Sequence, residues 1–234
     1  MANVRFQAHM QVTTIDPPQL MKFVRSQYPD VILHRPLQNI YQLILKKKCL
    51  PTQCMRWCCA ELKEQSGAGT VTVIGIRRAE SIRRAKRNEV EINNHKFSGS
   101  LDQFNRYRET EINCVRGKDK IILSPILHWG DHDIWQFIKS RNLPYCELYD
   151  MGFHRIGCIF CPMSNKKAIA RERLMFPGVE RTFKLTIKKL CETHNYGSLL
   201  GKNPDLIFEW WISKKNIKEF IADRIQQIKI KFDE

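Results

Sequence analysis

Residues 70–78, Thr-Val-Thr-Val-Ile-Gly-Ile-Arg-Arg, pass from a β-branched run into a glycine and two arginines. Val, Ile and Thr favour extended backbone, so this run predicts a strand over residues 70–76. A glycine at the end of a strand lets backbone approach a ligand closely, and arginines offer paired donors to a phosphate or sulfate. The stretch therefore predicts a strand with an anion site at its carboxyl end.

Strands and helices are predicted to alternate on both sides of this stretch. Ahead of it the patterns favour a strand, a helix, a strand and two helices, at residues 4–12, 17–24, 31–33, 40–47 and 56–64. Asp16 is expected to cap the first of these helices, with Pro17 at its first position. After the stretch, an apolar strand over residues 120–127 leads to a helix that Asp131 is expected to cap. This alternation predicts an α/β fold with a parallel sheet layered by helices.

Two further regions complete the predicted organisation. Residues 87–118 are polar, with Gly and Asn, and are predicted to form a long loop or insertion. Beyond Pro162 the pattern is mainly helical and ends in a helix over residues 212–230. We therefore expect an α/β domain at residues 1–165 and a mainly helical C-terminal extension at residues 166–234.

Composition limits the class of protein. The 234 residues are 43% hydrophobic, and no run of about 18 apolar residues or secretion signal is present, so no membrane contact is expected. Nine cysteines without such a signal favour reduced thiols or metal ligands over disulfides, which predicts a cytoplasmic protein. The net charge of +15 predicts an anionic partner, either a nucleotide or a nucleic acid such as tRNA or DNA. A merely solvated basic surface is the alternative.

Two tight cysteine pairs stand out. Cys58 and Cys59 are adjacent, and Cys158-Ile159-Phe160-Cys161 begins 99 positions after Cys59. Together the pairs can supply four thiolates to zinc or to an iron–sulfur cluster. Adjacent cysteines point in different directions, which suits the separate iron corners of a 4Fe–4S cube better than one tetrahedral ion. We therefore expect a 4Fe–4S cluster, with zinc as the alternative and small buried apolar cysteines as a third interpretation. The remaining thiols are expected to be dispensable for it, namely Cys49, Cys54, Cys114, Cys146 and Cys191. Cys54 is the exception to expect among them if the helix extends back that far, because it would then lie four residues before Cys58 on a similar helix face.

The predicted anion site follows the strand at residues 70–76. Ligands of an open parallel sheet bind beyond the carboxyl ends of its strands. The residues expected to contribute backbone approach, hydroxyl or guanidinium donors are Gly75, Arg77, Ser81, Arg83 and Arg84. Glu80 is expected to orient one of the arginines. An exposed cluster of salt bridges is the alternative interpretation of the same residues.

Five segments, taken together, resemble motifs of the phosphoadenosine phosphosulfate (PAPS) reductase family. Residues 56–63 resemble its C-C-x-x-L-K helix, and residues 75–84 resemble its arginine-rich motif. Residues 125–135 are similar to its P-I-x-x-W-x-x-x-D-V-W segment, residues 143–152 to the stretch that follows, and residues 155–162 to its G-C-x-x-C-P turn. The resemblance covers about residues 4–165, and the shared order of the motifs makes it specific.

This resemblance implies a fold, ligands and site residues. The fold is that of the adenine-nucleotide α-hydrolase (PP-loop) superfamily, a Rossmann-like parallel sheet. The implied ligand is ATP, adenylyl sulfate (APS) or PAPS, bound near Arg77, Ser81 and Arg83 or Arg84, and Lys63 of the C-C-x-x-L-K segment is assigned to the same anion site. Cluster-bearing APS reductases hold a 4Fe–4S cluster with a C-C and C-x-x-C set, which implies Cys58, Cys59, Cys158 and Cys161 as ligands. Adenine-nucleotide-linked sulfur chemistry is the implied function.

Two departures from the family pattern open alternatives. No S-G-G-x-D-S phosphate loop is matched, so we expect a partner chain or a homodimer to complete the fold. The chain alone is expected to bind nucleotide weakly and not to turn over ATP or PAPS. The family's nucleophilic E-C-G-L-H motif is also unmatched, and Cys191-Glu192-Thr193-His194 is a poor substitute. The alternatives are a component that inserts sulfur into nucleic acid, in modification or phage defence, and a non-catalytic binding module.

Overall fold

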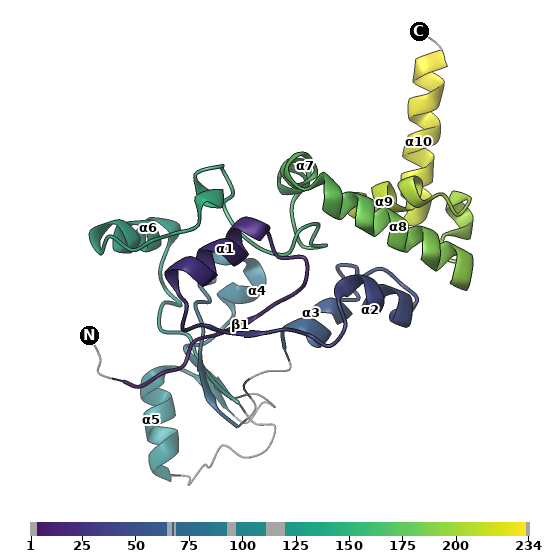
Figure 1. The fold of residues 1–234 in the computed structure, drawn as a ribbon. Coiled ribbons are helices and arrows are strands. Elements are labelled where there is room, and N and C mark those ends of the chain that lie inside the picture. The colour runs from purple at the N-terminus through teal and green to yellow at the C-terminus, as the bar shows by residue number, and fades with distance from the viewer. Residues whose placement is uncertain (1–3, 65–66, 68, 93–96, 111–119, 233–234) are drawn as a thin grey trace. The chain divides into compact units, whose positions relative to one another are not determined.

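The computed structural model describes residues 4–64, 67, 69–92, 97–110 and 120–232 (Figure 1). The chain divides into two compact units. The first unit contains residues 1–64 and 146–234, and the second contains residues 65–145. The chain therefore leaves the first unit, forms the second, and returns to the first.

The second unit is built on a four-stranded sheet in the order β3-β6-β4-β5. The strands are β3 (Val71–Val73), β4 (Val90–Ile92), β5 (Phe97–Gly99) and β6 (Ile121–Leu123). The opening stretch of the sequence analysis forms β3, which pairs in parallel with β6 in the register Val71 to Ile121. β4 runs antiparallel to both of its neighbours. Helices α4 (Ile82–Ala85), α5 (Leu101–Thr110) and α6 (Asp131–Ser140) complete the unit, with a 3₁₀ turn, η1, at Arg78–Glu80.

The sequence predicts a long loop or insertion at residues 87–118, and the loop interpretation is wrong for most of the residues that the structure describes there. This segment contains β4, β5 and α5, and residues 93–96 and 111–119, including Cys114, lie outside the described part. Val90 and Ile92 are buried with Phe104 and Ile121, and they form the core of this unit. A strand of three residues has too short an alternation of apolar and polar side chains to be recognised among polar neighbours. β4 therefore forms because it pairs with β6, and not because of its local propensity.

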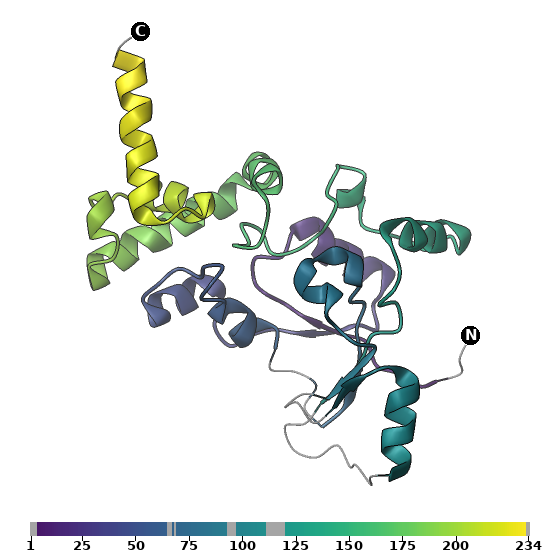
Figure 2. The ribbon, with the colours of Figure 1, turned by 180° about the vertical axis from the view of Figure 1, so that it is seen from behind.

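The first unit combines a small parallel sheet with helices. β1 (His9–Gln11) and β2 (Ile32–His34) pair in parallel, joined through α1 (Pro18–Gln27). Helices α2 (Ile40–Lys47) and α3 (Trp57–Leu62) follow. After the chain returns, it forms η2 (Glu147–Tyr149), α7 (Lys166–Met175), α8 (Pro177–His194), η3 (Ser198–Leu200), α9 (Pro204–Ser213) and α10 (Ile217–Phe232). Both views show α8 beside α9, with α10 leading away from them (Figure 2).

Two expected helix caps are wrong. The N-cap of α1 is Pro17, and the Asp16 carboxylate instead accepts hydrogen bonds from the Thr13 amide (2.6 Å) and hydroxyl (2.8 Å). The N-cap of α6 is Gly130, whose amide donates to Asp133 at 2.7 Å, while Asp131 is the first helical residue. In both places the acidic side chain expected to cap the helix has another partner: Thr13 donates to Asp16, and Arg77 donates to Asp131.

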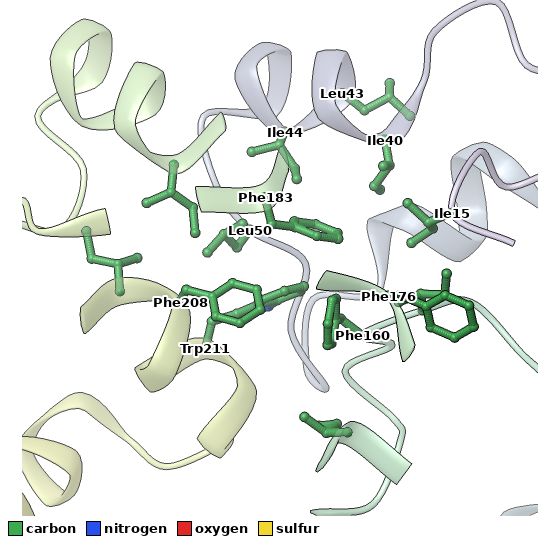
Figure 3. Close-up of a cluster of buried hydrophobic side chains, with 14 of the residues drawn as sticks. Ile15, Ile40, Leu43, Ile44, Leu50, Phe160, Phe176, Phe183, Phe208 and Trp211 are labelled. Carbon is green, nitrogen blue, oxygen red and sulfur yellow. The ribbon is translucent and has the colours of Figure 1, made fainter. Parts of the chain in front are cut away.

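The core of the first unit is rich in aromatic rings (Figure 3). Phe183 is fully buried, and its ring lies 4.9 Å from that of Trp211 and 5.1 Å from that of Tyr41. Phe208 packs against the same group, 5.4 Å from Phe160. Side chains from α2, the cysteine-bearing loop and the C-terminal helices therefore share one core. The domain division at residue 165 stays a prediction.

These observations confirm a mixed α/β fold with parallel strand pairs, flanking helices and a helical C-terminal region. Within the described residues, none of the helices combines the length and apolar character needed to cross a membrane.

Candidate functional site

The adjacent cysteines lie in the first turn of α3. This helix starts after Arg56, and its first residues are Trp57, Cys58 and Cys59. Trp57 and Cys58 pack against the core of the first unit, and both thiols remain half-buried. Packing of the tryptophan therefore fixes the start of the helix and leaves the two thiols at its accessible edge.

The second pair lies on a tight turn. The Cys161 amide donates to the Cys158 carbonyl at 3.2 Å, which closes the turn. Ile159 and Phe160, between the cysteines, are buried in the core, whereas both thiols are half-buried. The apolar pair in the middle of the motif thus anchors the turn and leaves the sulfur atoms near the surface.

The four thiols interact with one another electrostatically. The pKa of Cys58 is raised, first by its hydrogen bond to Cys59, then by burial and by the charges of Cys59, Cys161 and Cys158. The pKa of Cys59 is lowered to about 5, first by the hydrogen bond from Cys58, against the opposing effect of burial, and then by Arg56 and Lys63. Segments about 100 residues apart therefore meet at one place in the first unit.

Two cations border this group of thiols. A guanidinium nitrogen of Arg56 donates to the Cys59 sulfur at 3.4 Å, and this contact raises the pKa of Arg56. Burial lowers the pKa of Lys63, but the charge of Cys158 and a hydrogen bond to it outweigh that effect, so the pKa is raised. Lys63, predicted to bind the nucleotide anion, thus lies beside the cysteines. The Cys158 thiol also donates to the Thr13 hydroxyl at 3.4 Å.

The chemistry of the four thiols allows a thiolate-bound metal group. Soft thiolates suit both zinc and iron–sulfur clusters, and the choice between them stays a prediction. In the described part of the chain, no three His, Cys, Asp or Glu side chains are arranged to hold one metal ion. The fit to a metal group therefore rests on the donor chemistry of the four thiols, with Arg56 and Lys63 beside them to offset negative charge.

The other described cysteines have different surroundings. Cys146 and Cys191 are buried in the core, whereas Cys49 is half-buried and Cys54 is exposed. Burial raises the pKa of Cys191, which makes its thiol a weak nucleophile. The interpretation of residues 191–194 as a poor substitute for the family's nucleophilic motif stays a prediction. The dispensability of these cysteines stays a prediction.

The predicted anion residues of the second unit form a network of ion pairs. Arg77 donates to Asp131 at 2.7 Å and lies 3.6 Å from Glu80, which also pairs with Arg84. Ser81 caps α4 by accepting from the Arg84 amide at 3.2 Å. Glu80 therefore links two of the arginines. Asp131, 54 positions from Arg77, was missed by sequence reasoning because its only signal was that of a helix start.

Two other members of the predicted anion site differ from this network. Arg83 is exposed, and its side chain has no ion pair within the described residues. Gly75 is also exposed, and a Cβ there would meet only Ile126, at 3.6 Å. The protein's own packing therefore does not require a glycine at this position, and its role as a place of backbone approach stays a prediction.

The fold and these residues define a class: an α/β protein with a four-thiol site and an arginine-rich segment after a strand. Residues 19–164 match the phosphoadenosine phosphosulfate reductase domain, and the chain belongs to the PAPS reductase family.

Similar proteins include enzymes and an uncharacterized protein. The chain is 25% identical over 200 residues to an uncharacterized protein of Methanocaldococcus jannaschii, covering 82% of this chain and 35% of that protein. It is 24% identical over 174 residues to an adenosine 5'-phosphosulfate reductase of Oceanobacillus iheyensis, covering 70% of this chain and 62% of that enzyme. It is 29% identical over 120 residues to a phosphoadenosine 5'-phosphosulfate reductase of Xanthomonas axonopodis pv. citri, covering 51% and 49%. The chain thus spans less than two thirds of each of these relatives.

Proposed function

We propose that this chain is part of a sulfonucleotide reductase-like protein that binds APS or PAPS and carries a 4Fe–4S cluster. The observation that carries the proposal is that Cys58 and Cys59 lie close to Cys158 and Cys161 within one unit. The family and the names of the reductase relatives support the substrate class. The finer assignment to one sulfonucleotide is left to binding measurements.

The cluster would be held by the four cysteines. When bound, it would supply a redox-active centre whose properties depend on nearby charge and hydrogen bonds. Arg56 and Lys63 would offset the negative charge of the four thiolates, because each already interacts with one of the sulfur atoms. Thr13 would hold Cys158 in place through its hydroxyl.

The nucleotide's phosphate or sulfate would bind the arginine network of the second unit. Guanidinium groups recognise oxyanions through paired donors, much as they recognise carboxylates. Asp131 is 84% exposed, so its ion pair with Arg77 contributes little to stability, and little free energy is lost when another anion replaces the carboxylate. Asp131 and Glu80 would therefore keep the arginines oriented until a ligand oxyanion takes the place of a carboxylate.

Anaerobic purification followed by iron, sulfide and zinc analysis tests the cluster. About four irons and four labile sulfides per chain are expected, as four-thiolate ligation of a cube implies. Stoichiometric zinc without labile sulfide would contradict the proposal. Titration calorimetry with APS, PAPS and ATP tests the substrate class, and the proposal requires tighter binding of a sulfonucleotide than of ATP.

The net charge of +15 favours a second candidate, a role in nucleic-acid modification. Binding to DNA or tRNA that weakens steeply with salt, together with no affinity for APS or PAPS, would favour this candidate. The requirement for a phosphate loop from outside residues 1–234 stays a prediction. Fusing such a fragment ahead of residue 1 tests it, because turnover is then expected to rise.

A further inference from the structure

A buried carboxylate from the C-terminal helices contacts the middle of the C-x-x-C turn. The Phe160 amide donates to Oε2 of Glu172 at 2.7 Å. Glu172 lies on α7, and its side chain is almost completely buried, as is that of Phe160. The contact therefore joins the turn between Cys158 and Cys161 to a helix outside the segment that matches the family domain.

The backbone of the turn needs such a partner. Phe160 has a φ of +56°, in the left-handed region that residues with a side chain rarely adopt. Its ring packs among Phe183 and Phe208, so the residue cannot turn outward without leaving the core. Its amide is then buried as well, and an unpaired buried amide is costly. The ring and the Glu172 carboxylate together hold the central residue of the turn at two points.

A gain in folding stability does not explain why position 172 carries a glutamate. Burial raises the pKa of Glu172 to about 7, the hydrogen bond from Phe160 opposes that effect, and Lys214 opposes it further. Glu172 has no ion pair with any residue that the structure describes. A buried charge without a close counter-ion disfavours folding. Its presence beside a thiol-bearing turn therefore indicates a role in shaping that turn.

We propose that Glu172 is a positioning residue of the cysteine site, holding the turn in the form that keeps the Cys158 and Cys161 thiols beside Cys58 and Cys59. The backbone angles of Phe160 set the direction of the chain between the two cysteines. Loss of the carboxylate acceptor frees the Phe160 amide, and the turn then opens without unfolding the helices around it. The part of this inference that concerns metal uptake rests on the proposed function, whereas the part that concerns the thiols does not.

Site-specific alkylation of the reduced, metal-free chain tests the inference. Glu172→Gln keeps an acceptor oxygen, whereas Glu172→Met keeps the approximate size without one. In E172M, alkylation of Cys158 and Cys161, followed by mass spectrometry, is expected to be about tenfold faster, as about 1.4 kcal/mol of easier opening implies. Cys146 and Cys191 are expected to keep their rates in this variant. In E172Q all rates are expected to stay close to those of the parent chain.

The matched control is Glu180→Gln. Glu180 pairs with Arg173 of α7, so this variant perturbs the same helix without touching the turn. It is expected to leave Cys158 and Cys161 at parental rates. Three results would overturn the inference. They are parental alkylation rates in E172M, an equal acceleration in E172Q, and an acceleration of all four cysteines together. If E172M does not fold, Glu172→Asp takes its place, and failure of both to fold would assign Glu172 to overall folding instead.

Iron uptake gives a second readout. Reconstituted E172M is expected to hold less than half of the parental iron, and E172Q an amount close to the parental one. Parental iron uptake by E172M would contradict the metal part of the inference. If the parental chain itself takes up no iron, the proposed cluster fails, but the alkylation rates still decide whether Glu172 positions the turn.

Discussion

The two units hold their functional side chains by different physical means. In the first unit the cysteines lie on an aromatic core that includes Phe160, Phe183 and Phe208. In the second unit the arginines are tied to carboxylates, one of them the largely exposed Asp131, and the buried core consists of Val90, Ile92, Phe104 and Ile121.

This difference has consequences for function. Packing and buried hydrogen bonds are little affected by salt, so the backbone that carries the cysteines is expected to keep its form as salt rises. Ion pairs near the surface are weak and screened by salt, so their partners exchange readily. A redox group needs fixed ligands, whereas an anionic substrate needs donors that release one oxyanion for another. Under the proposed function, the first unit would meet the former requirement and the second unit the latter.

The largest expected effect is on the cluster. Cys158→Ser removes one of four thiolates, and iron is expected to fall from about four per chain to less than one, as incomplete ligation implies. Iron and sulfide analysis after anaerobic purification measures this. Cys49→Ser removes a half-buried thiol elsewhere in the same unit and is the control, with unchanged iron expected. Equal iron in the two variants would show that the four-thiol assignment is wrong.

Breaking the aromatic core tests whether packing supports the first unit. Phe183→Ala deletes a fully buried ring and is expected to lower the free energy of unfolding by about 3–5 kcal/mol. Chemical denaturation measures this loss. Leu185→Ala, on the same helix but 54% exposed, is expected to cost less than about 1 kcal/mol. Similar losses from both variants would remove the contrast between a packed and an exposed position.

A pH dependence sharpens the account of the buried carboxylate. The pKa of the Glu172 carboxyl is raised from 4.5, its ordinary value, to about 7 in the folded chain, because burial disfavours its charge. Between these values the folded chain binds the extra proton, so rising pH destabilises it, by roughly 2–3 kcal/mol in total. Urea unfolding at pH values from about 4 to about 8 measures the free energy of unfolding of the parent chain and of Glu172→Gln. The difference in stability between them is expected to grow in favour of the glutamine variant as pH rises; a constant difference would contradict the shift.

The smallest expected effect concerns the arginine network. Arg77→Ala is expected to weaken sulfonucleotide binding by about 1.5–3 kcal/mol, the usual contribution of a charge-assisted hydrogen bond. Calorimetry at low and high salt measures it, and the loss is expected to shrink as salt rises. Arg87→Ala is the control, since Arg87 pairs with Glu91 in the same unit but lies outside the predicted site. Unchanged affinity in a folded R77A variant would show that these arginines contribute only surface charge and do not bind the ligand.

Much of this organisation is determined locally by the sequence. The helix predicted at residues 40–47 has those same bounds as α2, because Asn39 and Gln42 form a capping box at its start. The β-branched run at residues 70–76 forms β3, whose bounds are Val71–Val73. The close spacing of Cys158 and Cys161 likewise implies a tight turn, which a local hydrogen bond closes. For the helix and the turn, neighbours along the chain supply the hydrogen bonds, whereas β3 takes its extended form from its residue types and its hydrogen bonds from β6.

Only the tertiary structure decided the partners of these elements. The link between Arg77 and Asp131 spans 54 positions, and the Glu172 contact with Phe160 joins a helix to a turn with no shared motif. β4 forms because β6 offers it a partner, and β5 forms because β4 does; their own residue patterns do not demand strands. Local propensity depends on chain neighbours, whereas the choice of a distant partner depends on which buried groups remain to be paired once the core has packed.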